Sequence, residues 1–185
     1  DDRRLRIHGQ DGVDVVDASP ASLAVRIHGD AGGDILRGGA NDDVIYGDAG
    51  DDIVFGGSGA DEIRTESAGA TPSASSDIVL GDHGEVVVAL AGGGEHVLRS
   101  LDLAGLDPFR PGAGDAVVRV ASDAGLAGAG DVIDAGGGAR NIVLGGHGGD
   151  AITVGSGVDA VLGDSGEVLL TAGVVTTVRS TATGE

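Results

Sequence analysis

The chain has no Cys, Lys, Met or Trp among its 185 residues, and only three residues are aromatic. The absence of Cys excludes disulfide bonds and thiolate metal sites. No apolar run approaches the roughly 18 residues that a membrane-spanning helix needs, so we expect no membrane insertion.

Positive charge is also scarce. Eleven Arg face 30 acidic residues, which gives a formal net charge of −19. Nucleic acids and anionic membranes are bound through basic patches, so we expect no nucleic-acid partner. Self-repulsion of this size loosens a compact state, and bound cations would relieve it.

Glycine is abundant, with 37 residues, and it recurs with a fixed period. Four nine-residue units run from Gly29 to Arg64 without a slip: GDAGGDILR, GGANDDVIY, GDAGDDIVF and GGSGADEIR. Position one is always Gly, position six is always Asp, and position eight is always aliphatic. The first six positions favour tight turns, and the last three favour a short strand. This period predicts an all-β fold, a parallel β-roll or β-helix solenoid with two units in each coil.

Side chains alternate along a strand, so position eight points inward when positions seven and nine point outward. The expected inward set is Leu36, Ile45, Val54 and Ile63. Tyr46 and Phe55 stand at position nine, and we expect them to be surface residues. A core of about one aliphatic side chain per unit, worth roughly 1.5–3 kcal/mol, does not offset the backbone entropy of nine ordered residues. Another interaction must therefore hold the turns together.

The position-six carboxylates supply that interaction. Stacked coils place units n and n+2 on the same edge, so Asp34 lies over Asp52 and Asp43 lies over Asp61. Bare carboxylates at this spacing repel each other, and a hard cation between them reverses the effect. Ca²⁺ takes six to eight oxygen ligands, including backbone carbonyls, which Gly-rich turns leave free. The pattern thus predicts Ca²⁺ as the bound ion.

The units resemble the GGxGxDxUx nonapeptide of RTX (repeats-in-toxin) proteins, a β-helix repeat that binds Ca²⁺. This resemblance implies that each ion lies between units n and n+2. The first unit would give the carbonyls of positions two and four plus its Asp, and the second the carbonyls of positions one and three plus its Asp. The implied ligand sets are Asp30, Gly32 and Asp34 with Gly47, Ala49 and Asp52, and Gly39, Asn41 and Asp43 with Gly56, Ser58 and Asp61.

Degraded units flank the regular ones. Asp14 occupies position six of a unit that starts at Gly9, and it reaches Asp34 only if two extra residues bulge out. A second run near Gly128 carries further candidate ligands, namely Asp131, Asn141, Asp150 and Asp159. Asn141 and Asp159 are 18 residues apart and could pair, whereas Asp131 and Asp150 are 19 apart and need a one-residue insertion.

A longer repeat overlies the short one, because residues 77–86 match residues 159–168 at an offset of 82. We therefore predict a first β-roll module at 1–90, a β excursion and loop at 91–127, and a second, more degenerate module at 128–185. Residues 65–76 and 104–114 are predicted as loops, and segments 86–103 and 116–121 as strands whose partners the sequence does not reveal.

The sequence offers no catalytic constellation. Gly163-Asp164-Ser165-Gly166 resembles the nucleophile segment of trypsin-like proteases, but His83 replaces the Ser in the equivalent turn and no triad follows. Neither HExxH nor GxSxG occurs. We expect no enzymatic activity from this segment.

The preferred interpretation is a structural Ca²⁺-binding segment of a large secreted bacterial RTX protein. It would fold on Ca²⁺ binding outside the cell or at the cell surface, and it could assemble with copies of itself into a filament or array. Two alternatives stay open: an export and folding domain attached to an RTX-type secreted enzyme, or a carbohydrate-binding adhesin module with its specificity in residues 86–127.

Overall fold

The computed structural model describes residues 4–66, 75–100, 109–123, 125–126 and 128–181. Every regular element in these ranges is a β-strand, which confirms the predicted all-β class. No helix in the described ranges is long and apolar enough to cross a bilayer. Of the two predicted loops, residues 67–74 and 104–108 lie outside the described part of the chain.

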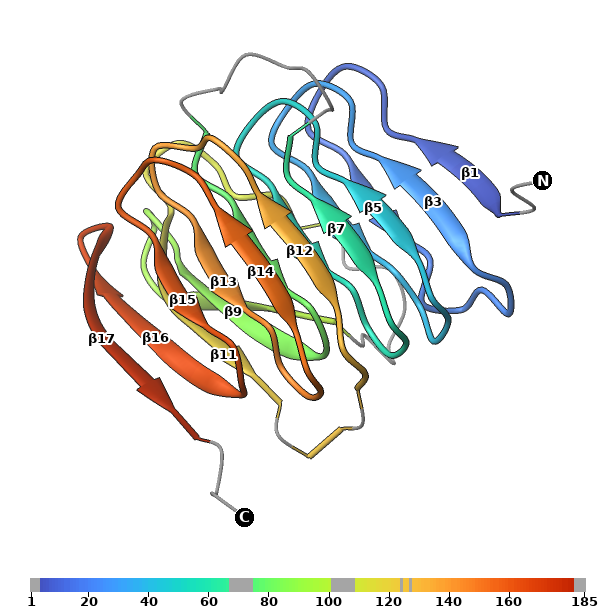
Figure 1. Ribbon diagram of the computed structural model, residues 1–185. Helices are drawn as coiled ribbons and strands as arrows, with labels where there is room; N and C mark the ends of the chain where they lie inside the picture. The colour runs from blue at the N-terminus through green and yellow to red at the C-terminus, as the bar shows by residue number, and fades with distance from the viewer. Residues whose placement is uncertain (1–3, 67–74, 101–108, 124, 127, 182–185) are drawn as a thin grey trace.

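Two parallel sheets of six strands each form a β-solenoid (Figure 1). The first parallel sheet contains, in spatial order, β1 (Leu5–His8), β3 (Val25–His28), β5 (Val44–Tyr46), β7 (Glu62–Arg64), β12 (Val132–Ala135) and β14 (Ala151–Val154). The second contains β2 (Val15–Asp17), β4 (Ile35–Arg37), β6 (Ile53–Phe55), β8 (Ile78–Leu80), β13 (Ile142–Leu144) and β15 (Ala160–Leu162).

Successive strands alternate between the two sheets from β1 to β8, so two nine-residue units make one coil as predicted. Insertions leave the register of the sheets intact. Ile63 of β7 pairs with Ile133 of β12, and Val79 of β8 pairs with Val143 of β13. Residues 1–90 and 128–185 thus contribute neighbouring strands to the same sheets. The division into modules stays a prediction.

Five further strands, two of them after the last strand of the roll, form a third, antiparallel sheet in the order β10-β9-β11-β16-β17. Its strands are β9 (Gly84–Ala89), β10 (Glu95–Arg99), β11 (Ala116–Ser122), β16 (Gly166–Thr171) and β17 (Val174–Ser180). Strands expected within 86–103 and 116–121 are therefore present, although residues 101–103 lie outside the described part of the chain. β11 lies between β9 and β16, so it joins the two copies of the longer repeat.

The three layers enclose two hydrophobic cores. The inner core lies between the parallel sheets and contains the four predicted inward residues, Leu36, Ile45, Val54 and Ile63, all completely buried. The outer core lies between the second parallel sheet and the antiparallel sheet, where Phe55 and Leu80 pack with Val86 and Leu98.

The surface placement predicted for Phe55 is therefore wrong, because its side chain is fully buried in the outer core. The antiparallel sheet covers the outward face of the second parallel sheet, so side chains on both faces of that sheet are buried, Arg37 beside Phe55 included. Tyr46, at the same position of the neighbouring unit, lies on the uncovered face of the first sheet and stays half-buried. One nine-residue pattern thus has two different outer environments.

Candidate metal-binding turns

Position-six residues form a ladder along each edge of the roll, where the chain passes from one parallel sheet to the other. The backbone N–H of Asp34 donates a 2.8 Å hydrogen bond to Oδ1 of Asp52. On the opposite edge, the N–H of Asp43 donates an equal bond to Oδ1 of Asp61. The structure therefore brings units n and n+2 together as the stacking argument expected.

The irregular units continue both ladders. The first-edge ladder consists of Asp14, Asp34, Asp52, Asp77, Asn141 and Asp159, and every N–H but the last donates to the Oδ1 of the next residue, at 2.7–3.1 Å. The second-edge ladder consists of Asp43, Asp61, Asp131 and Asp150, joined in the same way at 2.8–3.0 Å. The extra residues between Asp14 and Asp34, and between Asp131 and Asp150, do not prevent either contact.

Asp77 was missed by the sequence analysis. It lies 25 residues after Asp52 rather than 18, because the chain between the two carries seven residues more than one coil of the regular repeat. The longer repeat could have identified Asp77 as a ligand, since Asp77 is the counterpart of the predicted ligand Asp159. In the ladder, Asp77 accepts the N–H of Asp52 and donates its own N–H to Asn141.

The second carboxylate oxygen of most ladder residues is buried without a partner. Within the described part of the chain this applies to Oδ2 of Asp14, Asp34, Asp52, Asp61, Asp131 and Asp150. A buried carboxylate oxygen without a hydrogen bond or counter-charge is strongly unfavourable. The same atom repeating in six turns is what a row of cation sites requires.

Position-one glycines form the wall beside these oxygens. A Cβ added to Gly29 or Gly47 would lie 2.5 Å from Oδ2 of the Asp in the same unit. At Gly56 the corresponding distance, to Oδ2 of Asp61, is 2.6 Å. Real Cβ atoms do not approach so closely, so any larger residue would displace the carboxylate. The invariant Gly is thus explained by the close approach of its backbone to the Oδ2 atom and, at Gly29 and Gly56, also to a carbonyl oxygen of the next coil.

Burial governs the protonation of the ladder. Desolvation is the largest cause of the raised pKa of Asp52 and of Asp61, each to about 8, and neighbouring carboxylates add to the effect. Burial raises the pKa of Asp131 to about 7 and that of Asp77 to about 6, for the same main reason. Without a counter-charge, several of these groups would therefore hold protons at neutral pH. A divalent cation supplies the charge that keeps them ionised.

The carbonyls of the implied ligand sets are partly engaged already. Those of Asp30, Gly39 and Ala49 each accept a backbone hydrogen bond from the adjacent coil, at 2.7–2.9 Å. A carbonyl oxygen has two lone pairs, so each keeps one for a cation. The resulting donor set is entirely oxygen, which suits Ca²⁺ and disfavours soft metals.

Ser165, the residue in the protease-like segment, is buried, and its carbonyl accepts hydrogen bonds from Thr181 and Ser180. These hydrogen bonds connect the turn before β16 to the end of β17, so Ser165 has a structural role there.

A family model for the RTX calcium-binding nonapeptide repeat matches residues 28–63 with four copies. The match covers the four regular units and confirms the resemblance seen in their sequence. These units are thus RTX repeats, their fold is the β-roll, and Ca²⁺ is the ion that such repeats bind. Comparisons with curated proteins and with solved structures gave no match.

Proposed function

We propose that this chain is a structural segment whose coils are held together by Ca²⁺ at the position-six ladders, so that the roll folds only when the ion is bound. The observation that supports this most strongly is the repeated buried Oδ2 without a partner. Asp14, Asp34, Asp52, Asp61, Asp131 and Asp150 carry these atoms and are the proposed carboxylate ligands.

Other ladder residues differ from these six in how their side-chain oxygens are already engaged. Asn141 uses its side-chain oxygen in the ladder and donates its Nδ2 to the Ala135 carbonyl at 2.8 Å, so it brings no charge to a cation. Asp43 uses Oδ2 to accept the N–H of Gly39 at 2.7 Å, and that bond would have to share the oxygen with Ca²⁺. Asp77 is added to the set because it completes the first-edge ladder.

We place this segment outside the cell. RTX repeat proteins are generally secreted bacterial proteins, and the net charge of −19 makes the Ca²⁺-free chain self-repelling. Extracellular Ca²⁺ modules commonly have dissociation constants of about 10⁻⁴–10⁻³ M. An affinity in that range leaves the sites empty in the cytosol and fills them outside, which couples export to folding.

Circular dichroism during a Ca²⁺ titration of the chelator-treated chain tests this proposal at about pH 7.5. We expect a cooperative change from coil to β structure with Ca²⁺, and none with Mg²⁺, which demands a stricter octahedral geometry. Equilibrium dialysis in parallel gives the number of bound ions. A chain that is fully β-structured in chelator would contradict Ca²⁺-dependent folding. A folded chain that retains no Ca²⁺ on dialysis would contradict the ladder sites.

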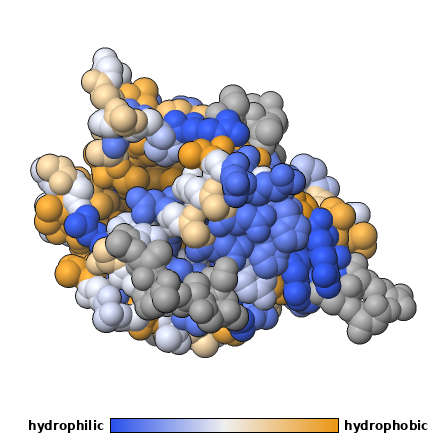
Figure 2. Space-filling model, turned by 90° about the horizontal axis from the view of Figure 1, so that it is seen from above, coloured by the Kyte–Doolittle hydropathy of each residue, from blue (hydrophilic) through white to orange (hydrophobic). Residues whose placement is uncertain are grey.

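A second proposed role, end-to-end assembly, rests on the open end of the described roll. The inward residues of the second parallel sheet are completely buried from Leu36 to Val143, but Val161 in the last strand, β15, is 39 % exposed. Figure 2, seen from above, shows hydrophobic surface in a hollow at the left, on the side where Figure 1 places β15 and β17. Among the described strands, β1 and β2 stand last in their sheets at the other end of the roll. A second copy stacked there would extend both sheets in register.

Sedimentation velocity in Ca²⁺ tests this assembly. We expect species that grow with protein concentration, and Val161→Lys should return the chain to a monomer. Val132→Lys is the matched control, because Val132 is 55 % exposed on the outer face of the first sheet, away from the open end. A monomer at all concentrations, or an equal effect of both substitutions, would contradict end-to-end stacking.

A further inference from the structure

A row of stacked rings crosses the outer face of the first parallel sheet, where its strands end. His8, His28 and Tyr46 end the strands β1, β3 and β5. The ring centroids of His8 and His28 are 4.8 Å apart, and those of His28 and Tyr46 are 4.5 Å apart, with interplanar angles of 5° and 8°. This stacking holds the imidazole of His28 between two neighbours, so its orientation is fixed.

Position-two aspartates meet these imidazoles. Asp30 and Asp48 both have a left-handed backbone, with φ of 69° and 70°. Nδ1 of His28 lies 2.9 Å from Oδ2 of Asp48, and Nδ1 of His8 lies 3.1 Å from Oδ2 of Asp30. Each histidine therefore faces the aspartate of the next coil along the roll.

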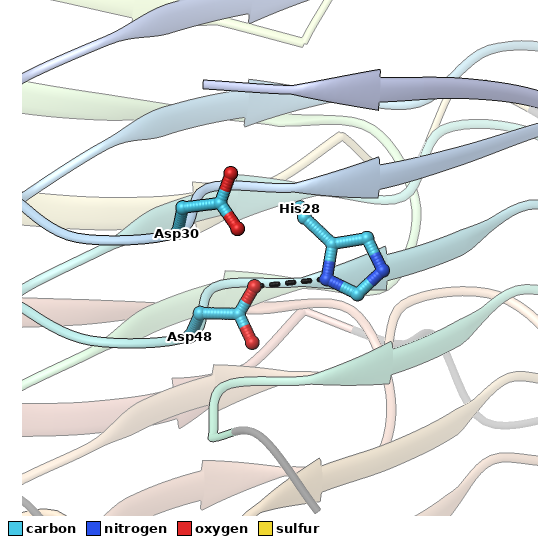
Figure 3. A group of neighbouring side chains, drawn as sticks. All are labelled: His28, Asp30 and Asp48. Carbon is cyan, nitrogen blue, oxygen red and sulfur yellow. Dashed lines mark hydrogen bonds and ion pairs between the residues drawn. The ribbon is translucent and has the colours of Figure 1, made fainter. Parts of the chain in front are cut away.

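Three of these side chains converge on one point (Figure 3). One donor atom from each of His28, Asp30 and Asp48 lies within 4.8 Å of the other two. Donors in a tetrahedral zinc site are roughly 3.4 Å apart at metal–ligand distances of about 2.0–2.1 Å. Small side-chain rotations would therefore close the group around an ion.

The donor chemistry differs from that of the ladders. An imidazole nitrogen with two carboxylates suits a borderline divalent metal, whereas the ladders offer oxygen alone. The side chains of His28 and Asp30 are 26 % and 35 % exposed, which leaves room for water as a further ligand. With a neutral imidazole, the two carboxylates carry a formal charge of −2, which a divalent ion would neutralise.

We propose that His28, Asp30 and Asp48 form a binding site for a divalent transition metal, with Zn²⁺ as the ion, distinct from the Ca²⁺ ladders. The site uses the carboxylate of Asp30, whereas the RTX resemblance implies a role for its backbone carbonyl. Asp48 comes from the coil after that of His28 and Asp30, so the ion ties two successive coils together. It does so through side chains in the turns that also carry Asp34 and Asp52, whose pKa values burial raises and the charges of Asp30 and Asp48 raise further.

Isothermal titration calorimetry with Zn²⁺ on the Ca²⁺-saturated chain tests the site. We expect Zn²⁺ to bind with an affinity that falls more than about 100-fold in His28→Gln and in Asp48→Asn, because each removes a direct ligand. His96→Gln is the matched control, since His96 stacks on Phe109 in a different part of the molecule. Circular dichroism in Ca²⁺ must show that every variant keeps the β-roll.

Three results would overturn the proposal: no Zn²⁺ binding by the unmodified chain, equal binding by His28→Gln, or displacement of Zn²⁺ by added Ca²⁺. The first would leave His28 and Asp48 as a hydrogen-bonded pair. The third would assign the cluster to the calcium system. Co²⁺ provides a second readout, because its visible absorption reports nitrogen ligation and should be lost in His28→Gln alone among the two histidine variants.

Discussion

The substitution Asp52→Asn separates the two tasks of a ladder carboxylate. Oδ1 of Asp52 accepts the N–H of Asp34 at 2.8 Å, and Oδ2 is buried without a partner. Asparagine keeps the first acceptor and removes the charge. Asn141 shows that the ladder accommodates this side chain, because its Oδ1 accepts the N–H of Asp77 at 3.1 Å. We therefore expect the variant to keep the fold and to bind Ca²⁺ more weakly.

The expected size follows from burial. Asp52 has no exposed surface, so its charge is poorly screened by water. Removing one partner of a buried charge pair costs about 3 kcal/mol or more. That energy corresponds to about a 100-fold loss of affinity at the sites that Asp52 shares. Calcium-free Asp52→Asn should also be more stable than the unmodified chain at high pH, because burial raises the pKa of Asp52 to about 8 and ionisation opposes folding.

Calorimetric and dichroic Ca²⁺ titrations measure both effects. Asp51→Asn is the matched control, since Asp51 is exposed, adjacent in sequence and loses the same charge. Titrations in buffers of different ionisation enthalpy also count released protons, and Asp52→Asn should release fewer than the unmodified chain. If Asp51→Asn and Asp52→Asn weaken Ca²⁺ binding equally, the ladder carboxylates act only through overall charge and the reasoning is refuted.

Three further predictions concern protonation, the glycine wall and the outer core. Burial raises the pKa of Asp61 from 3.8 to about 8, so the contribution of this group to the stability of the Ca²⁺-free chain is present below about pH 4 and is lost as the pH rises through 8. In chelator, circular dichroism should therefore show more β structure on acidification. A profile that does not change with pH would contradict this. Gly47→Ala should displace the carboxylate of Asp52 and weaken Ca²⁺ binding in calorimetry, while Gly149→Ala, where an added Cβ meets nothing within 4 Å, should not. Phe55→Ala should cost about 3–5 kcal/mol in urea unfolding with Ca²⁺ present, and a loss below about 1 kcal/mol would contradict its burial in the outer core.

The irregular segments mark the limit of sequence reasoning about the site. Spacing alone suggested that Asp131 and Asp150 pair only with an insertion, yet the sheets absorb that residue and the ladder bond forms at 3.0 Å. Asp77 escaped notice because an insertion precedes it, although the offset of 82 linked it to Asp159. Parallel strand pairing fixes the register locally, so a loop of any length can leave the roll and return without disturbing the ladder.

The sequence by itself determined the coil. Glycine turns, a buried aspartate and a three-residue strand recur every nine residues, and these local preferences suffice to specify the β-roll, the inner core and the Ca²⁺ chemistry. Only the tertiary structure decided which outer faces are covered. The antiparallel sheet, built from segments outside the four regular units, buries Phe55 and leaves Tyr46 beside His28. A periodic sequence fixes what every unit does alike, whereas non-local packing makes equivalent positions different.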